Sequence, residues 1–286
     1  MSRDRTPPLV SADWLRTRVD DPDTVILDGT TFTPGTGLSA PENYEAQRLP
    51  GAIFFDINAV ARRVPGPPHR MLPTPAEFAE DLSRLGLEHG RHYIVYDSHG
   101  LYSAARVWWM FRMHGYERIS VLDGGLPAWR DAGGEIVSGP GRVRPRTAWP
   151  VGRLGPWVRD WREIRDNLAT GAEIVVDVRP YEQFNGDTSH SYPGVRPGHI
   201  PGAVHLSQRD LRTARGDFLP KERIVALLAQ KGLSADSPIV ASCGSGVTAC
   251  ILSLAMDVLR GEPCPVYDGS WEEWGGRADL PNELDF

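Results

Sequence analysis

The sequence repeats itself once on the scale of a whole domain, and no other feature constrains the fold as strongly. Matching segments keep the same order in the two halves of the 286-residue chain, at offsets of about 145 to 151 residues. The matched pairs are 24–28 with 173–177, 48–53 with 199–204, 75–86 with 220–232, 94–97 with 239–243, and 122–129 with 266–274. Because solenoid repeats have units of only about 20 to 50 residues, this offset indicates a duplicated domain.

Each copy alternates short apolar runs with stretches of helical periodicity. In the first copy a strand over 93–97 precedes an apolar helix over 103–114, and a further strand follows at 120–125. This alternation predicts an α/β fold in which each copy is a parallel sheet with helices on both faces. The predicted boundaries are an N-terminal domain at 1–138, a linker rich in Pro, Arg and Gly at 139–156, and a C-terminal domain at 157–286.

Composition and charge exclude several classes of partner. The net charge of −6 gives no electrostatic reason to expect nucleic acid or an anionic membrane as a partner. No apolar run approaches the roughly 20 residues that span a bilayer. Residues 1–8 are polar and lack the apolar core of a signal peptide, so a cytoplasmic location is expected.

The chain has three cysteines, Cys243, Cys250 and Cys264. Their spacings match neither a disulfide framework nor a zinc site, and so few cysteines in a chain of this length fit a reducing compartment. We expect no metal and no cofactor. A redox pair of Cys243 with Cys250 is an alternative, although Cys250 is expected two turns into a helix and facing the core.

Cys243 opens the stretch CGSGVTAC, which ends at Cys250. An apolar run at 238–242 precedes it and a helix-forming run at 251–256 follows, which places the cysteine where a buried strand ends. Successive amides of a glycine-containing loop at a helix N-terminus can bind negative charge and stabilise a thiolate. The alternative is a buried structural cysteine. Gly244 and Gly246 favour the nucleophile, because a core cysteine needs no such loop.

The equivalent place in the first copy holds Asp97, which cannot act as a sulfur nucleophile. In parallel α/β sheets ligands bind beyond the carboxyl ends of the strands, which is where both Asp97 and Cys243 are expected. The sequence therefore predicts one catalytic copy and one copy that serves as a scaffold.

Several long matches in order make the chain resemble the tandem-domain rhodanese-like sulfurtransferases, and CGSGVTAC resembles the active-site loop of the 3-mercaptopyruvate sulfurtransferases. The other matches are RPGHIPGA at 196–203, GLYSAARVWWMF at 100–111, LDGG at 122–125, and YDGSW at 267–271 with Trp274. The resemblance implies a non-catalytic N-terminal domain and a catalytic C-terminal domain. It also implies a Cys243 persulfide that carries sulfane sulfur from a small anionic donor to cyanide, a thiol or a thioredoxin-like protein.

The expected site residues follow from this resemblance and from the loop chemistry. They are Cys243 and Ser245 as catalytic residues, and the loop positions Gly244, Gly246, Val247 and Thr248 together with Arg70 as substrate-binding residues. The loop amides would hold the charge of the persulfide. Ser245 would donate a hydrogen bond to the donor or the sulfur; its alternative role is to cap the following helix.

The chain departs from the mercaptopyruvate-using pattern at four places. Two donor-binding arginines of that family fall on Gln183 and Tyr192 here, and an Asp and a His of a proposed relay fall on Asn58 and Arg70. The donor pocket is therefore expected to be rebuilt.

Arg70 is a candidate replacement, because a guanidinium can bind a carboxylate in a bidentate way. Its neighbour His69 is a histidine, the residue type whose ordinary pKa lies closest to neutral pH. The alternative is that both are solvated loop residues. Arg179 is expected to brace the end of a strand through an ion pair.

Three other functions are alternatives to a mercaptopyruvate-like sulfurtransferase. A thiosulfate sulfurtransferase is disfavoured because Gly244 and Ser245 stand where thiosulfate users usually carry basic residues. A persulfide carrier in a biosynthetic pathway needs no small-molecule donor and stays open. A phosphatase of this fold needs an arginine that closes a C-x5-R loop. Ala249 and Cys250 stand at that place here, so a phosphatase is excluded.

Overall fold

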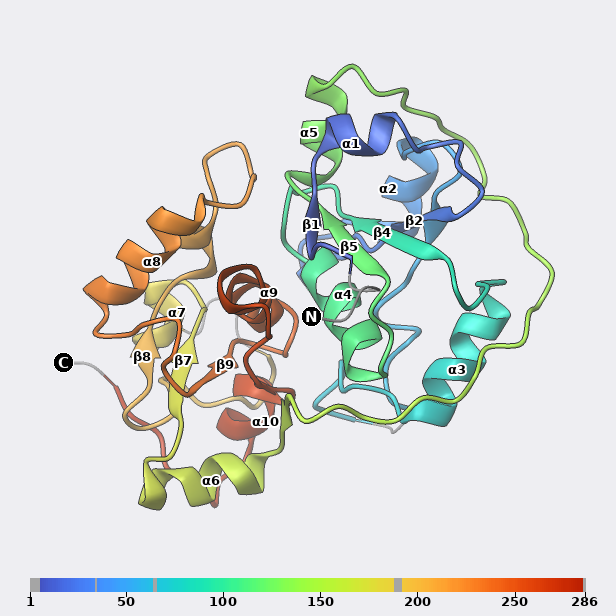
Figure 1. The fold of residues 1–286 in the computed structure, drawn as a ribbon. Helices are drawn as coiled ribbons and strands as arrows, with labels where there is room; N and C mark the ends of the chain where they lie inside the picture. The colour runs from blue at the N-terminus through green and yellow to red at the C-terminus, as the bar shows by residue number, and fades with distance from the viewer. Residues whose placement is uncertain (1–5, 34, 64–65, 188–191, 285–286) are drawn as a thin grey trace. The chain divides into compact units, whose positions relative to one another are not determined.

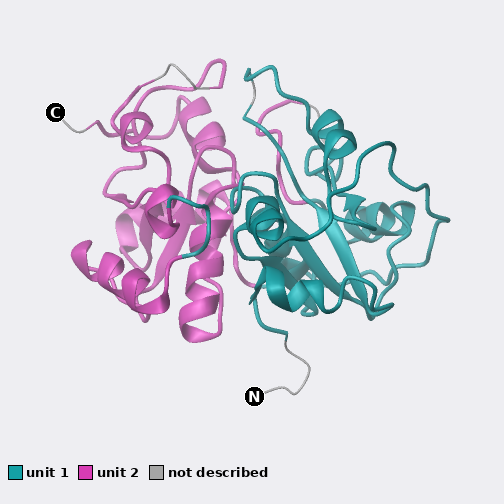
Figure 2. Ribbon diagram, turned by 90° about the horizontal axis from the view of Figure 1, so that it is seen from above, with its two compact units in different colours: residues 1–63, 73–155, 214–218 teal, residues 64–72, 156–213, 219–286 magenta. Residues whose placement is uncertain are grey.

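The computed structural model describes residues 6–33, 35–63, 66–187 and 192–284. These residues form two compact units, which Figure 2 shows in different colours. The first unit comprises the described parts of 1–63, 73–155 and 214–218, and the second those of 64–72, 156–213 and 219–286. Each unit therefore contains a short segment whose neighbours in the chain belong to the other unit.

Within its described residues, the first unit is built on a parallel sheet of five strands in the order β1-β5-β4-β2-β3 (Figure 1). The strands are β1 (Leu9–Val10), β2 (Thr24–Asp28), β3 (Ile53–Phe54), β4 (His92–Tyr96) and β5 (Ile119–Leu122). The helices are α1 (Ala12–Arg16), α2 (Ala40–Ala46), α3 (Pro75–Arg84), α4 (Ala104–Met113) and α5 (Gly125–Asp131).

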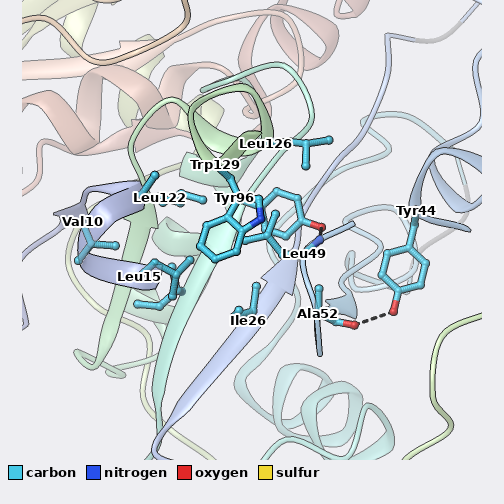
Figure 3. Close-up of a cluster of buried hydrophobic side chains, with 12 residues drawn as sticks. Val10, Leu15, Ile26, Tyr44, Leu49, Ala52, Tyr96, Leu122, Leu126 and Trp129 are labelled. Carbon is cyan, nitrogen blue, oxygen red and sulfur yellow. Dashed lines mark hydrogen bonds between the residues drawn. The ribbon is translucent and has the colours of Figure 1, made fainter. Parts of the chain in front are cut away.

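Side chains of the central strand β4 alternate between two apolar layers, as the period of a strand requires. Ile94 and Tyr96 point into one layer, where they join Leu15 of α1 and Trp129 of α5 (Figure 3). On that side Tyr44 of α2 donates a hydrogen bond of 2.7 Å to the carbonyl of Ala52.

Tyr93 of β4 lies in the opposite layer. Its ring is 5.3 Å from that of Phe111 on α4, and Phe111 is in turn 5.3 Å from Phe78 on α3. Helices therefore cover both faces of the sheet, so the inner strands β4 and β5 are buried along their whole length and read as apolar runs in the sequence.

The second unit repeats this plan, with a described sheet of five parallel strands in the order β6-β10-β9-β7-β8. The strands are β6 (Val158–Arg159), β7 (Ile174–Asp177), β8 (Val204–His205), β9 (Ile239–Ser242) and β10 (Val266–Tyr267). The helices are α6 (Trp161–Thr170), α7 (Tyr181–Phe184), the 3-10 turn η1 (Gln208–Leu211), α8 (Lys221–Gln230), α9 (Ala249–Arg260) and α10 (Ser270–Gly276).

One face of this second sheet packs under α6 and α10. Ile164 of α6 and Trp274 of α10 are fully buried there against Val240 of β9 and Tyr267 of β10. The α/β prediction with two sheets is confirmed, and in each unit the residue singled out from the sequence, Asp97 or Cys243, directly follows the central strand, β4 or β9.

Local signals explain where several helices begin. Ser11 caps α1, and Thr74 with Glu77 forms a capping box at the start of α3. Pro220 precedes α8 as its N-cap residue, whereas Pro75 is the first residue of α3. Helix α2 is not among the predicted elements, because it lies in a polar stretch rich in Pro and Gly that ends at Arg48.

None of the helices in the described residues is both long enough and apolar enough to span a membrane.

Candidate active site around Cys243

Cys243 follows the last residue of β9 and is 1% exposed. Its carbonyl accepts a hydrogen bond of 2.9 Å from the amide of Trp271, and the carbonyl of Gly244 accepts one of 2.8 Å from the amide of Glu272. The first turn of α10 thus fixes the backbone of the cysteine from one side. The predicted order of strand, cysteine, loop and helix is confirmed, with α9 beginning at Ala249.

Ser270 is the side chain that the structure places next to the sulfur. Its hydroxyl accepts a hydrogen bond of 3.1 Å from the amide of Cys243 and lies 3.9 Å from Sγ of the same residue. The hydroxyl has one proton, which it can donate to the carbonyl of Tyr267 at 2.8 Å or to the sulfur. Ser270 is therefore a candidate for stabilising negative charge on the sulfur.

The backbone of Ser270 carries a signal that the sequence analysis missed. Its φ of +49° lies in the left-handed region, which disfavours side chains, and Gly125 at the matching place of the first copy has φ +52°. A side chain on Gly125 would meet the carbonyl of Asp97 at 2.4 Å. The clue available in the sequence was that Ser270 stands where the first copy has Gly125, because a side chain kept at such a φ indicates a function.

The loop between Cys243 and α9 is shaped by glycine. Gly246 has φ +73°, a conformation that glycine adopts without cost. The N-cap position of α9 is Thr248, whose side chain makes no capping bond. Ser245 stands three residues before this position, so it does not occupy the N-cap of the helix. Val247 is buried and completes the turn into α9.

The Ser245 side chain is buried and forms a hydrogen bond with the hydroxyl of Tyr192. A side-chain carbon at Gly244 would lie 3.8 Å from the Tyr192 ring. Burial raises the pKa of Tyr192 above its usual value, while its bond with Ser245 and the charge of Arg70 act in the opposite direction. Tyr192 therefore stays protonated near neutral pH and lies against the loop that starts at Cys243.

Residues 66–72 belong to the second unit and bring His69 and Arg70 to this region. His69 Nδ1 lies 2.5 Å from Oε1 of the buried Glu272. The charges of both Arg70 and Glu272 act on the Tyr192 hydroxyl. The structure thus brings together Arg70, Tyr192, Ser245 and Cys243, of which Tyr192 was noted in the sequence only as a departure. Glu272 was missed, because a single glutamate outside any motif reads as a solvated side chain.

Asp97 takes the equivalent place in the first unit, directly after β4, and its side chain binds its own loop. Oδ2 accepts hydrogen bonds of 2.7 to 2.8 Å from the amides of Tyr102, Ser103 and Ala104, and Oδ1 accepts one of 2.9 Å from His99. The loop amides at the N-terminus of α4 therefore hold an anion that the chain itself supplies, as the positive end of a helix favours.

Arg179 braces the end of β7, as expected. Its guanidinium binds the Asp177 carboxylate through both Nε and Nη2, with Nη2 at 2.7 Å, and it also donates to the carbonyl of Gly198. The guanidinium carbon lies 4.9 Å from the ring centre of Trp271. Asp177 pairs with Ser242 of β9, so this ion pair supports the strand end from which Cys243 follows.

The other two cysteines are buried. Cys264 is fully buried, and burial raises the pKa of its thiol to about 12, so the thiolate is not formed at neutral pH. Cys250 is the second residue of α9, which corrects the expectation that it lies two turns into the helix. Its sulfur donates a hydrogen bond of 3.2 Å to the carbonyl of Gly246.

The two remaining departures from the family pattern lie on separate elements. Asn58 is an exposed residue after β3, where its amide donates to the Asp56 side chain at 2.9 Å, and Gln183 lies in the short helix α7. Among the described residues no group of three or more His, Cys, Asp and Glu side chains is placed to hold a metal ion.

Comparison with known proteins identifies the family. The model of the rhodanese-like domain matches twice, over residues 11–132 and 160–277. The chain belongs to the tandem-domain rhodanese-like sulfurtransferases. It is 38% identical over 281 residues to the 3-mercaptopyruvate sulfurtransferase of Escherichia coli, covering 96% of this chain and 97% of the relative. It is 36% identical over 298 residues to a mitochondrial thiosulfate/3-mercaptopyruvate sulfurtransferase of Arabidopsis thaliana, covering 96% and 78%.

The solved structures agree with this assignment. The crystal structure of the 3-mercaptopyruvate enzyme SseA from Escherichia coli superposes with a TM-score of 0.83 and 34% identity, over 93% of this chain and 99% of that one. The resemblance seen in the sequence is thus confirmed, and the chain is an enzyme of the sulfurtransferase type.

Proposed function

We propose that this rhodanese-like enzyme moves sulfane sulfur through a persulfide on Cys243. The donor is a small anion resembling 3-mercaptopyruvate, and the acceptor is cyanide, a small thiol or the thiol of a thioredoxin-like protein. In this proposal residues 157–286 form the catalytic domain, residues 139–156 the linker, and residues 1–138 a non-catalytic domain.

One observation carries the proposal, namely the relationship between the two copies of the loop. In the first copy the amides after β4 bind the carboxylate of Asp97, so the loop is already filled with a negative charge. In the second copy Cys243 stands in that place, followed by Gly244, Ser245, Gly246, Val247 and Thr248. A thiolate or a persulfide sulfur is the anion for which those amides are suited.

The first step is attack of the Cys243 thiolate on the sulfur of the donor. A sulfur–sulfur bond forms, the carbon–sulfur bond of the donor breaks, and its electron pair stays on carbon as the enolate of the keto acid. The enolate then takes the proton that the donor thiol carried, so the products are a Cys243 persulfide and a keto acid. The step needs no external oxidant or reductant, and it divides the transfer into two easier reactions.

The second step returns Cys243 to its starting state. An acceptor thiolate attacks the outer sulfur, the sulfur–sulfur bond to Cys243 breaks, and the electron pair leaves on the cysteine as its thiolate. Ser270, 3.9 Å from the cysteine sulfur, and Ser245 are the hydroxyls that support negative charge in both steps.

Arg70 supplies the positive charge for the donor. The guanidinium acts on Tyr192, whose hydroxyl is bonded to Ser245 beside Cys243, and a guanidinium suits a carboxylate. In this proposal the pocket has been rebuilt, with Tyr192 and Gln183 at two positions where mercaptopyruvate users carry arginine.

Two alternatives remain. A thiosulfate sulfurtransferase gains support from the Arabidopsis relative, whose name includes both donors. A persulfide carrier would load Cys243 from a partner protein without a small donor. The loop with Gly244 and Ser245 in place of basic residues favours the mercaptopyruvate-like donor. A cytoplasmic location belongs to this proposal as well.

Intact-mass spectrometry of the purified protein tests the proposal. The protein is incubated separately with 3-mercaptopyruvate, with thiosulfate, and with cysteine plus a cysteine desulfurase. We expect the mass of one sulfur atom to be added by 3-mercaptopyruvate, the same gain in the control variant Cys250→Ser, and no gain in Cys243→Ser. Loading only by thiosulfate or only by the desulfurase supports the corresponding alternative, and no loading from any source contradicts all three.

A further inference from the structure

Two buried carboxylates that follow β10 hold residues 69–72 in place. Asp268 is 3% exposed and accepts a hydrogen bond of 2.6 Å from the amide of Leu72. Glu272 is 2% exposed and accepts hydrogen bonds from His69, at 2.5 Å from the ring Nδ1 and at 3.4 Å from the amide. Arg70 lies between these two anchoring points, so they determine where its backbone runs.

Glu272 is also joined to the loop of the nucleophile. Its amide donates a hydrogen bond of 2.8 Å to the carbonyl of Gly244, while its carboxylate binds His69. The next residue, Glu273, differs, because its carboxylate accepts a hydrogen bond of 2.9 Å from the hydroxyl of Tyr267. Of the two adjacent glutamates, only Glu272 connects the segment of Arg70 to the loop of Cys243.

The charge on Glu272 depends on its surroundings. A buried carboxylate costs several kcal/mol unless a partner compensates its charge. The imidazole of His69 is the group in direct contact with Glu272, and its side chain is 62% exposed while the carboxylate is buried. The charges of Glu272, Arg70 and Cys243 all act on the hydroxyl of Tyr192, so these groups lie in one region.

We propose that Glu272 is a positioning residue for donor binding, because its contact with His69 holds Arg70 at the Cys243 loop. This inference rests on the proposed function, in which Arg70 binds the donor. A hydrogen bond to a carboxylate is about twice as strong as one between neutral groups, so loss of either partner weakens the anchor. Loss of His69 also leaves Glu272 without its contact partner near Arg70, which reduces the attraction for an anion.

Both effects act in the same direction. Loss of the contact between His69 and Glu272 should therefore raise the KM for an anionic donor. Because Glu272 acts through Arg70 and does not contact the reacting sulfur, kcat should change far less than KM.

Steady-state kinetics with 3-mercaptopyruvate, or with whichever donor loads Cys243, test the inference. Glu272→Gln should raise KM about fivefold and change kcat far less. His69→Gln, a change at an exposed ring, should do the same, and the double variant should be no worse than either single one.

The control is Glu273→Gln, which should leave KM unchanged. A fall in KM for Glu272→Gln, or an unchanged KM in both Glu272→Gln and His69→Gln, would overturn the inference, because Glu272 would then repel the donor or play no part in binding it. His69→Gln keeps the test decisive if Glu272→Gln does not fold.

The Arg70→Ala variant separates this inference from the proposed function. If Arg70→Ala raises KM while Glu272→Gln and His69→Gln do not, Glu272 does not position Arg70, but Arg70 still binds the donor. If Arg70→Ala has no effect while Cys243 still takes up sulfur, Arg70 does not bind the donor and Glu272 has no role in positioning it. The proposed persulfide chemistry on Cys243 would remain.

Discussion

Asp97 and Cys243 each follow the central strand of their sheet, at the same place in two copies of one fold. The carboxylate of Asp97 is held by four loop amides, and in the other copy the thiol of Cys243 takes its place. The same position in the fold therefore holds a carboxylate bound by its own loop in the first unit and a cysteine in the second.

Replacing Asp97 by alanine should destabilise the first unit. Four amides lose a charged acceptor that is fully buried, and buried donors without a partner are costly. We expect the free energy of unfolding to fall by about 3 kcal/mol, measured by urea denaturation. Asp97→Asn, which keeps an acceptor oxygen, should lose less. Equal losses in the two variants would show that the charge is not what the loop binds.

Arg179→Ala should be more damaging than a surface substitution. The change leaves the Asp177 carboxylate buried without its partner, a situation that costs about 3 to 5 kcal/mol. Thermal unfolding followed by circular dichroism should show this loss. Arg162→Ala is the control, because its ion pair with Asp160 is exposed and should contribute less than about 1 kcal/mol. Similar melting temperatures for the two variants would contradict this prediction.

Substitutions of Ser270 should separate backbone strain from chemistry. Ser270→Gly and Ser270→Ala both remove the hydroxyl beside Cys243, so both should slow sulfur loading about five- to tenfold, the equivalent of one hydrogen bond. Because φ is +49°, the glycine variant should be more stable than the alanine variant by about 1 kcal/mol. Rapid-quench kinetics and denaturant melts measure the two effects, and an unchanged loading rate would exclude the role of the hydroxyl.

Arg70→Ala should raise the KM for an anionic donor about tenfold, with a smaller change in kcat. The loss of a bidentate partner for a carboxylate is worth roughly 1.4 kcal/mol or more, which corresponds to that factor. Arg70→Lys should recover part of the affinity, since it restores the charge without the planar fork. The control Arg62→Ala changes an exposed arginine outside residues 66–72. An equal effect of both alanine variants would indicate a general loss of positive charge.

His92 should make the first unit sensitive to acid. Burial, with the nearby Arg118, lowers the pKa of His92 from 6.5 to about 4, and its Nε2 lies 2.9 Å from the Ser120 hydroxyl. Since the unfolded chain takes up the proton near pH 6.5 and the folded chain does not, the stabilisation is complete above pH 6.5 and is lost as the pH falls toward 4.

The matching variant is His92→Gln, which cannot take up that proton. Between pH 7 and pH 5 the unmodified protein should lose about 1 to 2 kcal/mol more than the variant, measured by urea denaturation at each pH. Equal losses would show that His92 stays accessible to protons in the folded state.

Much of the fold follows from local patterns in the sequence. The buried strands β4 and β9 appear as apolar runs because helices cover both of their faces, and Ser11 marks a helix start through an ordinary capping bond. Helix α2 was not predicted because prolines and glycines flank it, although Ser39 caps it. Propensity is a weak signal for a helix of seven residues.

The candidate site likewise has a part that could be predicted from the sequence and a part that could not. By itself the sequence determined the duplication, the strand–cysteine–loop–helix order at Cys243 and the ion pair of Arg179, because all of these depend on neighbours in the chain or on a repeated pattern. Only the tertiary structure decided that Glu272 pairs with His69, 203 residues away, and that the Ser270 hydroxyl lies beside the sulfur. The physical reason is that neither contact leaves a periodic pattern or a characteristic spacing in the sequence. Each exists because two distant backbones meet at the end of a sheet, and burial there makes a single carboxylate or hydroxyl matter.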